Sequence, residues 1–134
     1  MADFVDVATT IEPITQRGLC DCAVACLAMY LGLPYVAVAH AVPQLARVMR
    51  EGMSTRQIVN VGKRLGVPLL LSKSFDLEED SGILYVCDTE HGHAVLLWKG
   101  GAFNPADGLF WKDADTLLKT YGFAADTLIT RREA

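Results

Sequence analysis

The sequence has no dense patch of positive charge. Its 134 residues include 12 Lys and Arg against 16 Asp and Glu, which gives a formal net charge of -4 at pH 7. The basic pairs Lys63-Arg64 and Arg131-Arg132 stand alone. Proteins that bind nucleic acids neutralise the phosphate backbone with clustered Lys and Arg side chains. We therefore expect no nucleic-acid partner.

The sequence also lacks a hydrophobic run of the ~20 residues that a transmembrane helix needs, and its amino terminus lacks the basic residues of a signal peptide. We expect a protein without a membrane span that stays in the cytoplasm. Cysteine is scarce, and three of the four cysteines, Cys20, Cys22 and Cys26, lie within seven positions. This spacing is a poor framework for joining distant segments, so we expect reduced thiols.

Hydrophobic residues make up 51% of the chain, which is enough for one core without a metal or disulfide. We expect a single domain over residues 1–134. The first half predicts an arm over residues 1–15 and then helices over residues 22–31, 34–41, 44–50 and 54–65. The second half predicts strands over residues 67–71, 83–87, 94–98 and 123–130, and a helix over residues 113–121.

Gly100-Gly101 has the composition of a hairpin turn. Such a turn would lay residues 102–104 antiparallel beside the strand over residues 94–98. Helices first and an antiparallel sheet second is an α+β arrangement, with the N-terminal helices packed on a C-terminal antiparallel sheet. Two unlike halves of this kind favour a cleft between them.

Cys22 is the candidate nucleophile. It begins the predicted helix over residues 22–31, directly after Asp21, whose residue type is typical of an N-cap. A helix N-terminus offers the positive end of a dipole and free backbone N–H groups, and both favour the thiolate. We therefore expect a lowered pKa for this thiol, and the chemistry requires no cofactor.

His93 is the candidate base, because it opens an apolar strand that would fix its position. Asn104, on the neighbouring strand, can accept the imidazole N–H through its amide oxygen, and Asp107 can do so instead. Gln16 lies six residues before Cys22. Its side-chain amide can meet the Cys22 backbone N–H across a small pocket and bind an oxyanion there.

The remaining cysteines and histidines have structural interpretations. We expect Cys20, Cys26 and Cys87 to be structural thiols, with Cys26 and Cys87 in the core. We expect His40 to pack as a helix residue and His91 to lie in a loop.

A zinc site on Cys20, Cys22, His91 and His93 is the alternative for these side chains. However, the two cysteines are separated by one residue, and zinc-binding cysteines usually have a gap of about 2–4 residues. We therefore expect no metal.

The stretch from Gln16 to Met29 resembles the active-site signature of the bacteriocin-processing peptidases, which cleave leader peptides after a double glycine. In that family a Gln precedes an acidic-Cys-Gly element by the same interval, and Ala and Met follow in the helix. Residues 51–67, 93–97 and 104–108 are similar, in the same order, to the family's second helical block, its His strand and its Asp-Pro turn.

By this resemblance Cys22, not Cys20, is the nucleophile, and the fold is that of the papain-like cysteine peptidases. The chain departs from the family pattern at two positions. Ala23 stands where the family usually has Gly, which leaves the backbone N–H available for the oxyanion. Asn104 stands where the family has Asp, and this looks like the Cys-His-Asn set of papain.

The resemblance implies a cysteine peptidase that hydrolyses a peptide or isopeptide bond, with glycine favoured before the scissile bond. Its partner would be a peptide or protein substrate. The alternative from another class is a module with a peptidase-like fold that grips an extended peptide and does not cut it. The combined presence of Cys22, His93, Asn104 and Gln16 favours the enzyme, since a pure binder has no physical reason to keep them together.

Overall fold

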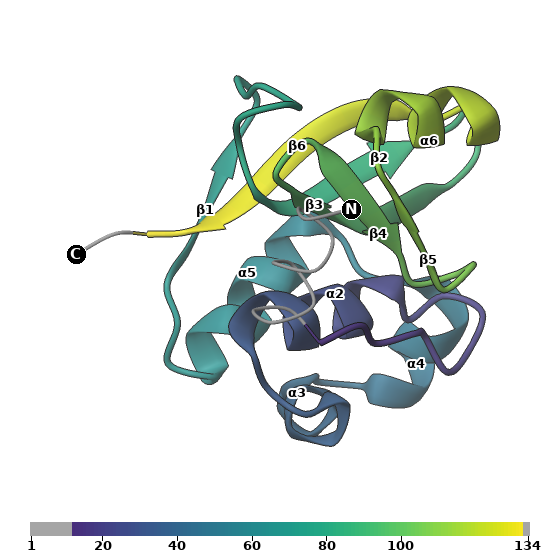
Figure 1. Ribbon diagram of the computed structural model, residues 1–134. Helices are drawn as coiled ribbons and strands as arrows, with labels where there is room; N and C mark the ends of the chain where they lie inside the picture. The colour runs from purple at the N-terminus through teal and green to yellow at the C-terminus, as the bar shows by residue number, and fades with distance from the viewer. Residues whose placement is uncertain (1–11, 133–134) are drawn as a thin grey trace.

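The computed structural model describes residues 12–132, and these form a layer of helices against a sheet (Figure 1). The helices are α2 (Cys22–Leu31), α3 (Tyr35–Ala41), α4 (Leu45–Glu51), α5 (Thr55–Arg64) and α6 (Ala114–Tyr121). The strands are β1 (Leu69–Ser72), β2 (Gly82–Cys87), β3 (Gly92–Trp98), β4 (Gly101–Asn104), β5 (Leu109–Trp111) and β6 (Ala124–Arg131).

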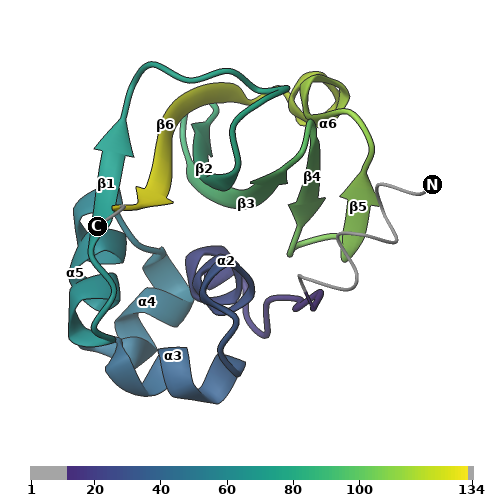
Figure 2. The same ribbon diagram turned by 60° about the vertical axis from the view of Figure 1, so that its left-hand side comes forward.

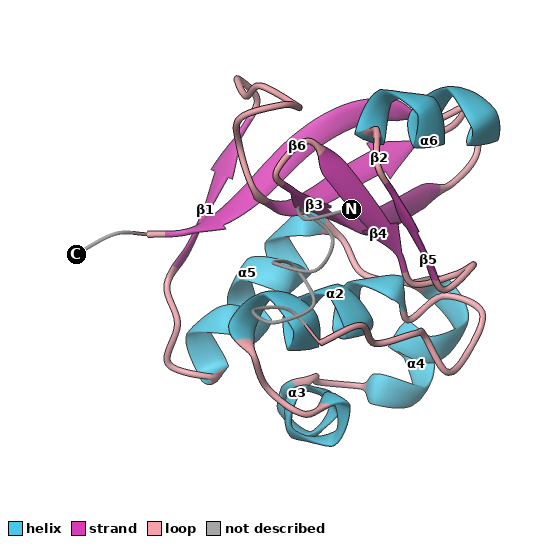
Figure 3. Ribbon diagram, viewed as in Figure 1, coloured by secondary structure: helices cyan, strands magenta, loops and turns pink. Residues whose placement is uncertain are grey.

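The six strands form one antiparallel sheet in the order β1-β6-β2-β3-β4-β5. The strands curve around α2, and α3, α4 and α5 lie on the same side of the sheet as α2 (Figure 2). Helix α6 lies on the opposite side, near β4 and β5. The predicted α+β class, with N-terminal helices packed on an antiparallel sheet, is confirmed (Figure 3).

The centre of the sheet is buried on both faces. On β3, Ala94 and Leu96 belong to the core that contains α2, whereas Val95 and Leu97 belong to the core that contains α6. This is the two-residue alternation of a strand. By the same alternation His93 shares a face with Val95 and Leu97, so the strand carries it toward the α6 side of the sheet.

Helix α2 is buried along nearly its whole length, and of its residues only Tyr30 is more than 8% exposed. Its continuous apolar sequence packs between the sheet and the other helices. Gly32, with a φ of 68°, ends it in the left-handed conformation that glycine adopts without strain. Helix α5 begins differently, with a capping box in which Ser54 and Gln57 each bind the backbone N–H of the other.

The helices and strands that the sequence predicts are all present, with their ends shifted by at most two residues. The predicted hairpin lays β4 antiparallel beside β3, with Gly101, Ala102 and Phe103 paired to Trp98, Leu97 and Leu96, so that the turn is Lys99-Gly100 and not the predicted Gly100-Gly101. Strand β5 is not predicted from the sequence. The predicted arm over residues 1–15 lies outside the described residues up to residue 11, and residues 12–15 have no regular secondary structure.

Within residues 12–132, no single helix has the length and apolar composition of a membrane span. Helices α2 and α3 together would have them, but the pair is bent by 116°.

Candidate active site

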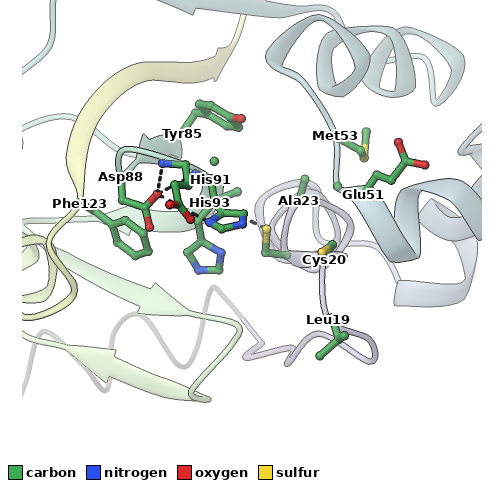
Figure 4. Close-up of a pocket in the computed structure, with 15 residues that line it drawn as sticks. Leu19, Cys20, Ala23, Glu51, Met53, Tyr85, Asp88, His91, His93 and Phe123 are labelled. Carbon is green, nitrogen blue, oxygen red and sulfur yellow. Dashed lines mark hydrogen bonds and ion pairs between the residues drawn. The ribbon is translucent and has the colours of Figure 1, made fainter.

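The helical half and the sheet face each other across a cavity of about 370 Å³ (Figure 4). The helical half contributes Cys22 and Met53 to its lining, and the second half contributes Tyr85, His93 and Phe123. The predicted nucleophile and the predicted base therefore open onto the same space, although they are 71 positions apart in the sequence.

Cys22 is the first residue of α2, as predicted, and its side chain is 8% exposed. Its Sγ accepts a hydrogen bond from the backbone N–H of Ala94, with a distance of 3.4 Å between sulfur and nitrogen. The backbone N–H of Ala23 also bonds to this sulfur. Because Ala94 directly follows His93 on β3, the sulfur lies against the strand that carries the predicted base.

Asp21 is fully buried beside Cys22, and its side chain does not cap α2 as its position predicts. The carboxylate instead accepts the backbone N–H groups of Arg17 at 2.8 Å and Gly18 at 2.7 Å, and the hydroxyl of Tyr35. Burial alone would raise the pKa of Asp21, but these hydrogen bonds outweigh it and lower the pKa below the ordinary 3.8. The ionised carboxylate thus holds the loop that leads into Cys22.

The Cys22 thiol is protonated at neutral pH, and the expected lowering of its pKa is wrong. Burial raises the pKa of the thiol to about 11, and the hydrogen bonds from Ala94 and Ala23 offset only part of that rise. The negative charge of Asp21 raises the pKa further. Desolvation and a neighbouring carboxylate therefore outweigh the favourable helix end.

Asn104 is buried and lies beside His93, with 2.8 Å between His93 Nε2 and Asn104 Oδ1. Two further contacts fix which end of the amide faces the imidazole. Oδ1 also accepts the backbone N–H of Ala106 at 3.0 Å, and Nδ2 donates to a carboxylate oxygen of Asp107 at 3.3 Å. Because Oδ1 can only accept, His93 Nε2 must carry the proton, and Nδ1 is left with a free lone pair.

Burial lowers the pKa of His93 below the ordinary 6.5, and the Asn104 hydrogen bond and the charge of Asp107 offset this only in part. The imidazole is therefore neutral at pH 7. Cys22 and His93 therefore line the same cavity as a neutral thiol and a neutral imidazole, and Nδ1 is the available base. Of the two orienting residues predicted as alternatives, Asn104 contacts His93 and Asp107 contacts Asn104.

The Gln16 side chain folds the loop that precedes Cys22. Its Nε2 donates to the carbonyl oxygens of Gly18 at 2.9 Å and Leu19 at 3.0 Å. An amide has two N–H donors, so both are occupied in this conformation. Its Oε1 is buried and has no hydrogen-bond partner among the residues described. The oxyanion role of Gln16 stays a prediction. For Gln16 to donate to an oxyanion, these hydrogen bonds to the loop must first break.

The four cysteines are all free thiols. Cys20 lines the same cavity as Cys22. Cys26 is fully buried in the core, as predicted, but Cys87 is half-buried and does not belong to the core.

His40 is exposed on α3, so the prediction that it packs within the protein is wrong. His91 lies in the loop before β3, as predicted. Across residues 12–132, no three His, Cys, Asp or Glu side chains lie together in a way that could hold a metal ion. The alternative zinc site on Cys20, Cys22, His91 and His93 thus has no ligand geometry to support it.

Two aromatic residues, one in contact with His93 and one in contact with Asp107, are not predicted from the sequence as part of the site. The Phe123 ring stacks on the imidazole, with 5.5 Å between ring centroids and 21° between planes. The Tyr121 hydroxyl donates to Asp107 at 2.7 Å. Their signal in the sequence is an aromatic residue on each side of Gly122, which ends α6.

No family model matches the chain, and a comparison with curated proteins finds no match. The function is therefore inferred from the site itself.

The buried contact between Tyr35 and Asp21 predicts a stability effect. Tyr35→Phe removes one donor to a buried carboxylate and should lower the free energy of unfolding by about 1.5–3 kcal/mol. Urea denaturation at pH 7 measures this. Tyr30→Phe is the matched control, because within residues 12–132 the Tyr30 hydroxyl accepts the exposed backbone N–H of Arg131 and bonds to no buried charge, and it should cost less than about 1 kcal/mol.

The sign of the pH dependence follows from the lowered pKa of Asp21. Its contribution to stability is present above the ordinary pKa of 3.8 and is lost as the pH falls through the lower folded-state value. The difference between wild type and Tyr35→Phe should therefore shrink in strong acid. An equal difference at pH 7 and at pH 2 would contradict this assignment.

The raised pKa of Cys22 predicts how its alkylation depends on pH. In a Cys20→Ser background, the rate constant for iodoacetamide at Cys22 should rise about tenfold for each pH unit between pH 7 and 9, because the thiolate fraction does. Mass spectrometry of the peptide that contains Cys22 measures the rate. A rate independent of pH from 5 to 9 would show a preformed thiolate and contradict the neutral pair.

Proposed function

We propose that this chain is a papain-like cysteine peptidase, with Cys22 as nucleophile, His93 as base and Asn104 as the residue that orients the base. One observation carries the proposal. The sulfur of a cysteine at a helix N-terminus lies 3.4 Å from the strand amide next to His93, and the imidazole of His93 is bonded to an asparagine oxygen at 2.8 Å. This is the nucleophile, base and orienting group that acyl transfer requires.

The chemistry begins from the neutral pair. As the Cys22 sulfur attacks the substrate carbonyl carbon, its proton moves to Nδ1 of His93, and the carbonyl π electrons move to oxygen. The tetrahedral intermediate collapses when the imidazolium gives that proton to the leaving amine, which leaves an acyl thioester on Cys22. Water then attacks the thioester, and Nδ1 takes the proton of the water. The Cys22 thiolate leaves, recovers this proton and releases the carboxylic acid.

The backbone N–H of Cys22 is the first donor for the oxyanion. It lies at the start of α2 and precedes the first hydrogen bonds of the helix, in which the backbone N–H groups of Val24 and Ala25 donate to the carbonyl of Asp21. Gln16 would supply the second donor when its side chain leaves the loop carbonyls of Gly18 and Leu19. Binding of the substrate would supply the free energy for this rearrangement.

The substrate class is a peptide or isopeptide in an extended conformation, since the cavity is open between the two halves and both Cys22 and His93 line it. The resemblance to the double-glycine leader peptidases supports glycine before the scissile bond. A series of peptides that differ only at this residue, Gly against Ala and Leu, tests the preference.

A second candidate function is a peptide-binding module that does not cleave. Two observations favour it: the raised pKa of the Cys22 thiol and the occupied amide donors of Gln16. The two functions differ in one measurement. Cleavage of a bound peptide by wild-type protein, lost in Cys22→Ala with binding retained, supports the peptidase. Equal binding without cleavage in both proteins supports the module.

The roles predict a ranking of variants. Cys22→Ala and His93→Ala should each lower kcat by about 10⁴-fold or more while the protein stays folded, because either change ends covalent catalysis. Asn104→Ala should cost less, since the charge of Asp107 remains nearby. Cys20→Ser should be close to wild type. Loss of activity in Cys20→Ser with activity retained in Cys22→Ser would overturn the assignment of the nucleophile.

Gln16 has its own prediction. If its amide turns to the oxyanion, Gln16→Ala should lower kcat by about 10²–10³-fold with little change in KM. Gln16→Glu is the matched variant, since it keeps the length of the side chain but removes the N–H donors. Both variants should also weaken the loop before Cys22. Wild-type kcat in both variants would leave the Cys22 N–H as the sole donor.

A further inference from the structure

The His93 imidazole belongs to a closed circuit of contacts, which we call the Asp107 circuit: His93, Asn104, Asp107, Tyr121 and Phe123. From His93 it runs through the 2.8 Å contact to Asn104 and the 3.3 Å hydrogen bond from Asn104 to Asp107. The Tyr121 hydroxyl donates to the same Asp107 oxygen at 2.7 Å. Tyr121 stacks on Phe123 with 5.8 Å between centroids, and Phe123 stacks on His93 at 5.5 Å.

Asp107 is the best-bonded member of the circuit. One of its oxygens, Oδ2, accepts from Asn104, from Tyr121 and, at 3.0 Å, from the indole N–H of Trp111. The other oxygen accepts the backbone N–H of Leu109 at 2.8 Å. Donors on both oxygens fix the plane of the carboxylate, and a carboxylate held in this way can only accept from the Asn104 amide nitrogen.

The end of α6 supplies the other half of the circuit. Gly122 has a φ of 71° and reverses the chain, and the backbone N–H of Phe123 bonds back to the carbonyl of Leu118 at 2.9 Å. This turn places Tyr121 and Phe123 on either side of the helix stop, where both rings reach the sheet. Phe123 also lines the cavity.

We infer that Asp107 and Tyr121 are positioning residues for His93. They act through Asn104 to set the tautomer of the imidazole, and Asp107 supplies a negative charge on the far side of Asn104. The catalytic part of this inference rests on the proposed peptidase function. The positional part concerns the imidazole alone.

The physical argument is electrostatic as well as geometric. Attack by Cys22 leaves His93 as an imidazolium, and Asn104 is neutral, so the direct hydrogen bond brings no full charge to it. Asp107 supplies that charge from behind Asn104. Its charge raises the pKa of His93, whereas burial lowers it. Tyr121 keeps its proton, since its hydrogen bond to Asp107 raises its pKa.

Other titratable groups also surround the cavity. They are Cys20 from the loop before α2, Cys22 from α2, Glu51 from α4, Tyr85 from β2, and Asp88, Glu90 and His91 from the loop between β2 and β3. None of these donates to or accepts from Asp107 in the hydrogen bonds described for residues 12–132. A change at Asp107 can therefore be assigned to the circuit.

A purely structural role for Asp107, as the anchor of the turn between β4 and β5, makes a different prediction. A substitution of Asp107 would then lower stability without changing the tautomer or the pKa of the imidazole. The distinguishing measurement is therefore an NMR titration of the imidazole nitrogens in 15N-labelled protein, assigned with His93→Gln, together with pH profiles of kcat/KM.

In wild type, Nε2 of His93 should carry the proton. Asp107→Asn should lower the pKa of His93 and so move the acid limb of kcat/KM to lower pH. It should lower kcat by on the order of 10-fold to 100-fold, because the imidazolium loses charge and orientation. Adding Asn104→Asp in the Asp107→Asn background should restore the pKa of His93, since it returns a carboxylate to the imidazole.

Tyr121→Phe keeps the exposed ring and removes only the donor, so the fold should survive. It should lower kcat a few-fold with KM unchanged. Asp113→Asn is the matched control, because Asp113 caps the start of α6 without touching the circuit. It should lower stability and leave the tautomer and pKa of His93 unchanged.

The inference is overturned if Asp107→Asn leaves both the tautomer and the pKa of His93 unchanged, or if Asp113→Asn shifts them equally. The NMR readout needs no turnover, so it separates this inference from the proposed function. If the expected shifts occur in a protein that cleaves no peptide, the positioning circuit is supported and the peptidase proposal fails.

Discussion

Helix α2 is surrounded by the sheet and by the other helices, so its amino terminus ends inside the protein. A buried helix end must find partners for its free N–H groups and for the polar side chains beside it. Asp21, directly before this helix end, has an ionised carboxylate, and it accepts hydrogen bonds from the loop N–H groups and from the Tyr35 hydroxyl. The same burial that presses Cys22 against β3 also removes it from water, and the Asp21 charge lies next to it. One constraint therefore both places the Cys22 thiol and keeps it protonated.

A neutral resting pair has consequences for how the site can work. A thiolate and an imidazolium at this depth would need strong compensation for their desolvation, and the residue that touches His93 is an uncharged asparagine. Under the proposed function, charge appears on the imidazole only as the sulfur attacks, when Asp107 can stabilise it through Asn104. Interactions that strengthen only at this stage lower the barrier without tightening the ground state. A thiol that is unreactive before substrate binds is also protected from adventitious oxidation.

The sequence predicts the elements well because its apolar periodicity and its stops at Gly32, Gly66 and Gly122 agree with the tertiary packing. Strand β5 escapes prediction because it has three residues and depends on pairing with β4. The predicted site residues Cys22, His93 and Asn104 could be chosen from the sequence because Cys22 begins a predicted helix and the other two lie on neighbouring strands of a predicted hairpin. What could not be predicted arises from burial and from long-range contacts. These are the raised pKa of Cys22, the turn of Asp21 into its own loop, and the aromatic residues that α6 brings to His93.

The two halves of the site meet through the packing of α2 on β3, and this packing depends on small side chains. Ala25 and Ala28 on the helix and Ala94 on the strand are all 1% exposed or less. A strand and a helix approach closely only where no large side chain separates them, and packed interiors do not yield to extra volume without shifting the backbone. The 3.4 Å contact between the Cys22 sulfur and the Ala94 amide needs that close approach. The position of Cys22 against β3 therefore depends on small core residues, and the Asp107 circuit orients the imidazole and supplies the negative charge behind Asn104.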